Sequence, residues 1–257
     1  MSHISYSELK NWCHCPFYHK LVNIDKIKVF EGNEYTAFGT ALHSVCEDLL
    51  VEEEISTSEE ELFSDKFRQE LKKLNIEKLN KELVVSMFKQ GQRLSSKAIP
   101  ALQDYFGDYE VIQAEEKLYE PIDNVKDYLF KGYIDLVIKT GDTYHIIDWK
   151  TCSWGWDNRK RSDKMIVYQL VLYKYFFCKK YNIEPSKVRT HFALLKRTSN
   201  KKIVELFEIT SGSKRIENAL ELLQKAIKII KSGTHIKNKL SCTSGYGCEF
   251  YKTKYCN

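Results

Sequence analysis

Residues 130–151, FKGYIDLVIKTGDTYHIIDWKT, decide the fold that the sequence predicts. Two runs rich in β-branched and aromatic residues flank the dipeptide Gly141-Asp142, and this composition is typical of β-strands. A two-residue Gly-Asp connection indicates a tight hairpin, in which Thr140 pairs with Thr143. The stretch therefore predicts an antiparallel β-hairpin at the centre of a sheet.

Two carboxylates meet in this hairpin. The register places Asp135 opposite Asp148, and Lys150 follows on the same face because side chains alternate along a strand. Opposed like charges destabilise a sheet, so the pair needs a cation, or one carboxyl must hold a proton. Mg²⁺ or Mn²⁺ suits such oxygen ligands, and Lys150 could orient a water or stabilise charge on a phosphoryl group. The alternative is a surface hairpin with scattered charges.

Composition indicates a globular protein that functions inside a cell. The chain has 257 residues, 43% hydrophobic and 29% charged, with a net charge of +5 that permits an anionic partner without establishing one. It contains no apolar run of about 20 residues and no signal-peptide core, so we expect no membrane partner. The expected location is the cytoplasm, or the host cell if the protein is viral. Its eight cysteines favour metal or iron–sulfur binding over disulfides.

Three short motifs follow one another along the chain: Gly132-Tyr-Ile-Asp135, Asp148-Trp-Lys150-Thr151 and Gln169-Leu-Val-Leu-Tyr173. Together they resemble the RecB-type nuclease signature of the PD-(D/E)xK superfamily. The family includes the nuclease domains of RecB and AddB and the CRISPR-associated RecB-like iron–sulfur exonucleases. The resemblance implies an α/β restriction-endonuclease-like core with a mixed central sheet flanked by helices.

The resemblance also implies a set of metal ligands. A lone helical histidine is usually structural, but Gly39-Thr-Ala-Leu-His43 matches the family segment that supplies an imidazole ligand. His43 would then bind Mg²⁺ or Mn²⁺ with Asp135, Asp148 and the backbone carbonyl of Trp149. Two further acids, Glu47 and Glu115, are possible neighbours of the metal, although each is equally consistent with a solvated carboxylate.

Other residues are candidates for contacting DNA. In the family, the motif Gln169-x-x-x-Tyr173 borders the active site and contacts DNA or the catalytic lysine. The segment after Lys150 combines aromatic and basic residues, which grip single strands by stacking and by phosphate contacts. The residues in question are Trp154, Trp156, Arg159, Lys160 and Arg161. The alternative is a flexible loop whose tryptophans pack on the domain.

Cysteines at both chain ends predict an inorganic cluster. The C-terminal segment carries Cys242, Cys248 and Cys256 and is too short to bury itself, so a metal staple is physically sensible. With Cys15 they form a four-thiolate set suited to a [4Fe–4S] cluster or zinc. Cys13 could compete with Cys15. The iron–sulfur nucleases share the one-plus-three arrangement, often with a smaller gap than the five residues between the first two C-terminal cysteines here.

The sequence thus predicts one RecB-like nuclease domain over residues 1–257. A helical insertion covers residues 55–107, and residues 1–30 with 233–257 form a region tied by the cysteine cluster. The predicted function is a metal-dependent deoxyribonuclease, most simply a single-strand or end-directed exonuclease in recombination, repair or replication, with a possible helicase or recombination partner. The alternatives are a structure-specific endonuclease and a cluster-stabilised DNA-binding subunit of a larger complex.

Overall fold

The computed structural model describes residues 2–51, 56–245 and 247–256. The chain forms two compact units. Unit 1 comprises Met1–Glu31, Leu118–Gly132 and Gly212–Asn257, and unit 2 comprises Gly32–Lys117 and Tyr133–Ser211. Residue 55 of the predicted insertion, and residues 1, 246 and 257 of the predicted cysteine region, lie outside the described residues. The division into one nuclease domain with an insertion stays a prediction.

Unit 2 contains the predicted hairpin in a mixed sheet. Strand β3 (Tyr128–Thr140), which begins in unit 1, pairs antiparallel with β4 (Thr143–Cys152). The register runs from Thr140 opposite Thr143 to Leu136 opposite Ile147, as predicted. Strand β4 then pairs parallel with β5 (Val188–Lys196), which pairs antiparallel with β6 (Val204–Ile209). Strand β2 (Glu110–Pro121) pairs with β3. The α/β fold with a mixed central sheet is therefore confirmed.

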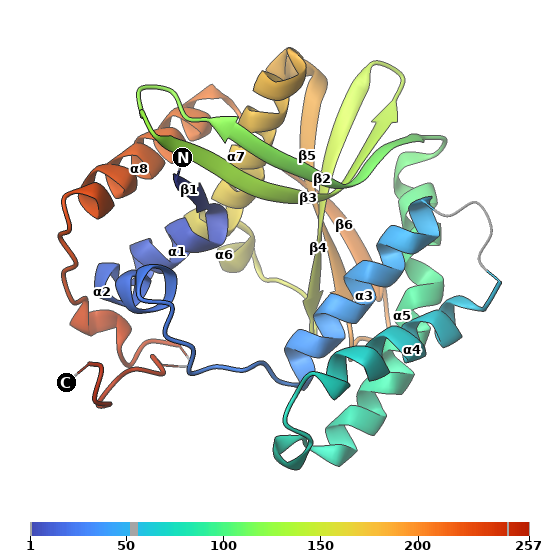
Figure 1. Cartoon of the computed structure of the whole chain (residues 1–257). Coiled ribbons are helices and arrows are strands. Elements are labelled where there is room, and N and C mark those ends of the chain that lie inside the picture. The colour runs from blue at the N-terminus through green and yellow to red at the C-terminus, as the bar shows by residue number, and fades with distance from the viewer. Residues whose placement is uncertain (1, 52–55, 246, 257) are drawn as a thin grey trace. The chain divides into compact units, whose positions relative to one another are not determined.

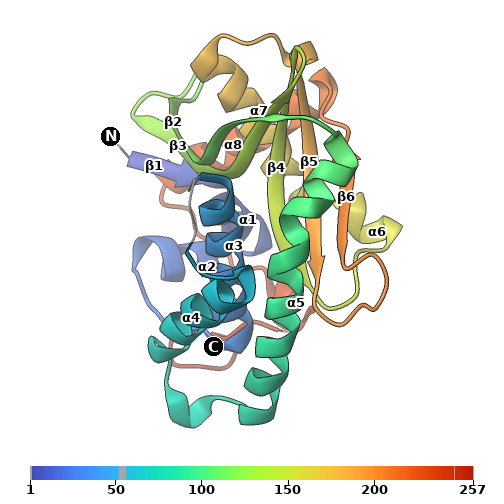
Figure 2. The same cartoon turned by 90° about the vertical axis from the view of Figure 1, so that its right-hand side faces the viewer.

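Helices cover both faces of the strands of unit 2 (Figures 1 and 2). Its helical elements are α3 (Glu34–Val51), α4 (Glu59–Lys72), η2 (Ile76–Lys78), α5 (Lys81–Phe106), α6 (Asn158–Arg161), α7 (Lys164–Tyr181) and η3 (Pro185–Lys187). Ile147 and Trp149 of β4 share a buried core with α3, α4 and α5. Tyr144, on the opposite face of β4, contacts Phe177 of α7.

An aromatic cluster packs α4 against α3 and α5. Phe38, Phe63 and Phe67 are at most 1% exposed, and Phe63 lies 5.3 Å from Phe38 between ring centroids. Gly91 of α5 makes this packing possible, because a Cβ atom there would lie 1.9 Å from the Phe63 ring. The helices within the predicted insertion thus contribute to a densely packed core.

Unit 1 joins the two ends of the chain. Strand β1 (Ser2–Ser5) pairs parallel with the first residues of β3, and Ser5 then caps α1 (Tyr6–His14). The remaining elements are α2 (Pro16–His19), η1 (Lys20–Ile24), α8 (Ser213–Lys231) and η4 (Lys239–Ser241). The N-terminal helices and C-terminal segment lie side by side (Figure 1), where Phe17 N donates to Ile236 O at 3.2 Å.

None of the helices that the structure describes combines the length and the apolar character that crossing a bilayer would require.

Candidate active site

Strand β4 carries the buried centre of the candidate site. Asp148 is 1% exposed and forms an ion pair with Lys150, two residues further along the same face. Helix α7 supplies the second partner, because Gln169 Nε2 donates a hydrogen bond to Asp148 Oδ1 at 2.7 Å. The other oxygen, Oδ2, is buried and is the atom that forms the ion pair with Lys150 Nζ. The carboxylate is therefore fixed on one side and faces the lysine ammonium on the other.

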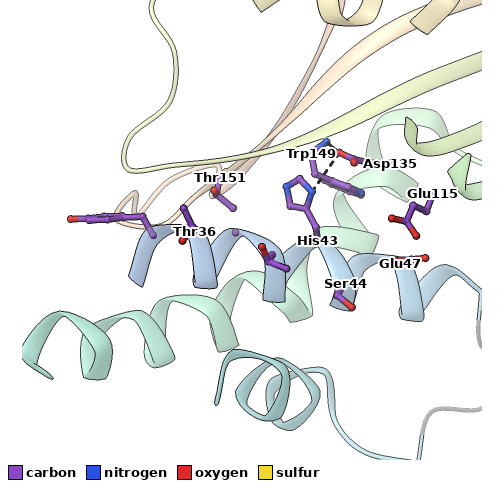
Figure 3. A pocket seen from close by; sticks show the side chains of 11 residues that line it. Thr36, His43, Ser44, Glu47, Glu115, Asp135, Trp149 and Thr151 are labelled. Atoms are coloured by element: carbon purple, nitrogen blue, oxygen red, sulfur yellow. Dashed lines mark hydrogen bonds and ion pairs between the residues drawn. The ribbon is translucent and has the colours of Figure 1, made fainter. Parts of the chain in front are cut away.

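Asp135 lies just beyond the last recorded pair of the β3–β4 ladder. Its Oδ2 atom accepts a hydrogen bond from the backbone N–H of Trp149 at 2.8 Å. His43 Nδ1 of α3 lies 3.5 Å from the same oxygen. Helix α3 approaches β4 closely at Gly39, where a Cβ atom would lie 3.3 Å from Thr151 Oγ1. The Gly39-x-x-x-His43 spacing thus brings the imidazole to the carboxylate (Figure 3).

The two carboxyl groups respond to their surroundings in opposite directions. The pKa of Asp148 is raised to about 6, mainly by burial; Lys150 opposes the rise and the charge of Asp135 adds to it. Burial also acts to raise the pKa of Asp135, but the hydrogen bond and charge of His43, the charge of Lys150 and the Trp149 N–H outweigh it. The pKa of Asp135 is therefore lowered. Such a split pair is typical of functional carboxylates.

A cleft of about 760 Å³ opens beside Asp135. Its lining includes His43, Glu47 and Glu115, which Figure 3 shows near one another. Burial and the charge of Glu115 raise the pKa of Glu47. The neighbouring Glu116 instead points into the protein, where it accepts a hydrogen bond from Tyr181 at 2.9 Å. Glu115 has a φ of +50°, so the backbone turns at this residue and presents its carboxylate to the cleft.

The cleft also contains residues that sequence reasoning missed. Tyr35 is 50% exposed, and the Arg197 guanidinium lies 5.0 Å from its ring centroid. Thr36, Thr40 and Ser44 were also missed, whereas the lining residues Gly39 and Thr151 belong to the quoted motifs. The helical repeat of Thr36, Thr40, His43 and Glu47 along α3 could have indicated this polar face.

The Gln169–Tyr173 pair lies next to Asp148. Gln169 Nε2 lies 3.3 Å from Tyr173 Oη, which it contacts in addition to Asp148. Tyr173 is 6% exposed, and burial and the charge of Asp148 raise its pKa. Its hydroxyl therefore stays protonated beside the carboxylates. A direct contact of either side chain with DNA stays a prediction.

The aromatic and basic segment after β4 divides into buried and exposed residues. Trp156 is 8% exposed, with its ring 5.0 Å from that of Phe192, and Arg161 pairs with Glu205 at 2.8 Å. These two residues match the alternative in which the segment packs on the domain. Trp154 is 74% exposed and is the tryptophan of this pair that a base could reach. Arg159 and Lys160, in α6, are also exposed.

The candidate cysteines all belong to unit 1. Cys15 is buried, and its sulfur accepts the backbone N–H of Asn238 at 3.3 Å. Cys242 Sγ lies 3.9 Å from Asn238 O. Burial raises the pKa of the Cys248 thiol, and the charges of Cys242 and Cys256 contribute to the rise. All eight cysteines are free thiols.

Neither predicted metal centre is a closed ligand shell. Within the described part of the chain, no group of three or more His, Cys, Asp or Glu side chains is arranged to hold a metal ion. The donor chemistry of Asp135 and Asp148 nevertheless fits a divalent cation, because the two carboxylates lie near enough that the charge of Asp135 raises the pKa of the buried Asp148. For the cysteines, the thiol groups suit a metal, and Cys15 and Cys242 both lie next to Asn238.

Comparison with known proteins identifies the class. The family model of the PD-(D/E)XK nuclease superfamily matches residues 3–256. The chain therefore belongs to the PD-(D/E)XK nuclease superfamily, whose nuclease activity implies a nucleic acid substrate and whose members typically use a divalent metal. No curated protein sequence matches the chain.

Solved structures support the fold. A Eubacterium rectale protein named "Putative exonuclease" is similar, with a TM-score of 0.59 and 11% identity over 94% of this chain and 86% of that one. At this identity the similarity concerns the fold alone. A protein named SSO0001 has a TM-score of 0.36 and 14% identity, over 87% of this chain and 84% of its own, and this match carries no argument.

Proposed function

We propose that the protein is a metal-dependent deoxyribonuclease that degrades DNA from an end or along a single strand. The observation that carries the proposal is the buried Asp148–Lys150 ion pair, coupled to Asp135 beside the cleft. A surface hairpin with scattered charges would not bury a carboxylate with a raised pKa. The similarity to the Eubacterium rectale protein is consistent with exonuclease activity.

Each site residue has a proposed role. His43, Asp135, Asp148 and the carbonyl of Trp149 would hold Mg²⁺ or Mn²⁺. A divalent ion in such a site polarises the phosphate and acidifies the attacking water. Lys150 would orient that water and stabilise the negative charge that develops on the phosphate.

The neighbouring residues would fix this arrangement. Gln169 holds Asp148 through the 2.7 Å hydrogen bond, and the Trp149 N–H and His43 hold Asp135. These contacts limit rotation of both carboxylates before DNA binds. Glu47 and Glu115 would tune the local charge, and Tyr173 would border the strand. Trp154, Arg159 and Lys160 would contact DNA. The packed Trp156 and Arg161 could do so only if their segment moved.

We also propose that Cys15, Cys242, Cys248 and Cys256 hold a [4Fe–4S] cluster, with zinc as the alternative metal. The N–H of Asn238 that Cys15 accepts is the kind of donor that supports a metal-bound sulfur. Iron, zinc and acid-labile sulfide should be measured in protein purified without oxygen. Equal amounts of iron and sulfide support the cluster, and zinc alone supports the alternative. If the protein contains neither iron nor zinc, the proposal that these cysteines hold a metal is contradicted.

The proposed activity is tested with DNA substrates labelled at either end. With Mn²⁺ or Mg²⁺, we expect the protein to shorten linear single strands from one end and to leave closed circular single strands intact. Cutting of the circle would identify the endonuclease alternative. Binding of DNA without cleavage of any substrate would support a DNA-binding subunit of a recombination or helicase complex. Cleavage of RNA of the same sequence tests whether the protein discriminates between ribose and deoxyribose substrates.

Two variants make the test specific. Asp148→Asn should abolish cleavage, because it removes the charge that a cation needs while nearly keeping the shape. Asp142→Asn is the matched control, since this exposed aspartate lies in the turn of the same hairpin. If both variants cleave as the native protein does, the proposed site is wrong.

A further inference from the structure

The excess positive charge of the chain is confined to unit 1. This unit has 15 lysines and arginines against 9 aspartates and glutamates, a formal charge of +6. Unit 2 has 25 basic against 26 acidic residues, a formal charge of −1. Residues 212–257 alone hold 9 of the basic and 3 of the acidic residues of unit 1. The unit that contains Asp135 and Asp148 therefore does not supply the net attraction for a polyanion.

A groove in unit 1 concentrates this charge. It has a volume of about 640 Å³ and is lined by residues of α8 and of the connection from β2 to β3. Figure 1 shows the course of these two elements. The lining of the groove includes four lysines, Lys126, Lys225, Lys228 and Lys231, and the one carboxylate Glu221. Three of the lysines follow one another along α8 at three-residue spacing, so their side chains lie on neighbouring turns.

The walls of the groove are tied together by polar contacts. Gln224 Nε2 of α8 donates to the carbonyl of Asp123 at 2.9 Å, in the connection between the strands. Lys231 Nζ lies 3.5 Å from the carbonyl of Lys126 and 6.0 Å from the Tyr128 ring centroid. Both walls are thereby fixed relative to each other without an added ligand.

Three of the four ammonium groups that line the groove have no polar partner among the described residues. The side chains of Lys126, Lys225 and Lys228 form no hydrogen bond or ion pair within residues 2–51, 56–245 and 247–256. Like charges three residues apart on a helix repel each other. An anionic ligand with several charges would relieve that repulsion, and a phosphodiester chain offers one charge per nucleotide.

We propose that this groove of unit 1 binds the phosphate backbone of the DNA substrate through residues other than the catalytic carboxylates of unit 2. The proposal rests on the nuclease function proposed above and extends it. The six steps from Lys225 to Lys231 rise about 9 Å along α8, which is roughly the length of two to three nucleotides along a duplex strand. With Lys126 on the facing wall, the groove would neutralise two to three phosphates. Because it contacts no base, it would bind DNA of any sequence.

The salt dependence of binding measures these phosphate contacts. Each one contributes about 0.7 to the slope of log affinity against log salt for single strands and about 0.9 for duplexes. The double substitution Lys225→Gln with Lys228→Gln should therefore reduce the slope by about 1.4 for single strands. Glutamine keeps good helix propensity, so α8 should remain folded, and circular dichroism would verify this.

The experiment uses full-length protein in EDTA and a fluorescein-labelled oligonucleotide, titrated by anisotropy over a range of KCl concentrations. The matched control is Lys81→Gln with Lys89→Gln, which removes the same charge from exposed positions on α5. A slope change confined to the Lys225 and Lys228 variant supports the groove, whether for single strands, duplexes or both. An equal change in both variants, or no change in either, overturns it.

Two further readouts separate the possible failures. Hydrolysis of bis(p-nitrophenyl) phosphate, which is too small to span the groove, should be the same in both double variants and the native protein. If the native protein hydrolyses neither this compound nor DNA, the proposed function fails while the binding result still tests the groove. If the Lys225 and Lys228 variant binds DNA normally but loses affinity for poly-glutamate, the groove takes an acidic protein and the proposal is overturned.

Discussion

Replacing Asp148 by asparagine should stabilise the metal-free protein at alkaline pH while abolishing cleavage. Asp148 is 1% exposed, and burial raises its pKa from 3.8 to about 6. An unfolded chain releases this proton near pH 3.8, whereas the folded protein retains it until about pH 6. The folded state thus binds more protons between these values, and its stability falls as pH rises through this window.

The size of the effect follows from the pKa difference. At about 1.4 kcal/mol per pH unit, ionised Asp148 destabilises the metal-free protein by about 3 kcal/mol above pH 6. Asparagine resembles the protonated acid in shape and avoids this penalty. The predicted gain is therefore up to about 3 kcal/mol at pH 8, and it should vanish near pH 4, where the native side chain is itself largely protonated.

The assay is urea unfolding in EDTA at both pH values, followed by tryptophan fluorescence. Three of the four tryptophans, Trp149, Trp154 and Trp156, lie in unit 2 and report on the unit that contains the substitution. Asp142→Asn serves again as the control and should show little change at either pH. A variant that is less stable than the native protein at pH 8, or a gain of equal size at pH 4, would refute the reasoning.

Three further predictions concern other parts of unit 2. Gly91→Ala should lower the free energy of unfolding by about 1–3 kcal/mol, because the added Cβ would lie 1.9 Å from the buried Phe63 ring. Gly212→Ala is the control and should not lower it, because no atom lies within 4 Å of the Cβ added there. Thermal unfolding compares the two variants. Burial, with the charges of His145 and Arg189, lowers the pKa of His191 to about 3. The His191 side chain therefore stays neutral in the folded protein, whereas in the unfolded chain it is protonated below about pH 6.5. Stability should therefore fall by about 1.4 kcal/mol per pH unit below 6.5, and urea unfolding of His191→Asn should show a shallower fall, while an unchanged slope would contradict the assignment. Gln169→Leu should lower kcat on DNA about 10- to 100-fold, because it frees the Asp148 carboxylate, and a change confined to KM would instead point to a role in binding.

The hairpin could be predicted because its register is set locally. The Gly141-Asp142 loop fixes Thr140 opposite Thr143, and strand alternation carries this pairing to Leu136 and Ile147. The relation of His43 to Asp135 came from a resemblance, and its physical basis is the close approach of α3 to β4 at Gly39.

Other features depend on tertiary packing and are not visible in sequence. Glu115 and Glu116 alternate in a strand, but only the backbone turn at Glu115 determines which carboxylate reaches the cleft. Trp154 and Trp156 have similar neighbours in sequence, yet Trp156 packs on Phe192 while Trp154 is exposed. The parallel pairing of β1 with β3 joins residues more than a hundred positions apart, and no local pattern encodes it.

The central claim is that Asp135 and Asp148 together hold one divalent ion that the nuclease reaction requires. Calorimetric titration of metal-free protein with Mn²⁺ tests it most directly, using the native protein, Asp148→Asn and the Asp142→Asn control. The account predicts a site in the native protein and the control that is lost in Asp148→Asn together with DNA cleavage. Undiminished Mn²⁺ binding by Asp148→Asn, or DNA cleavage by the native protein in EDTA, would contradict it.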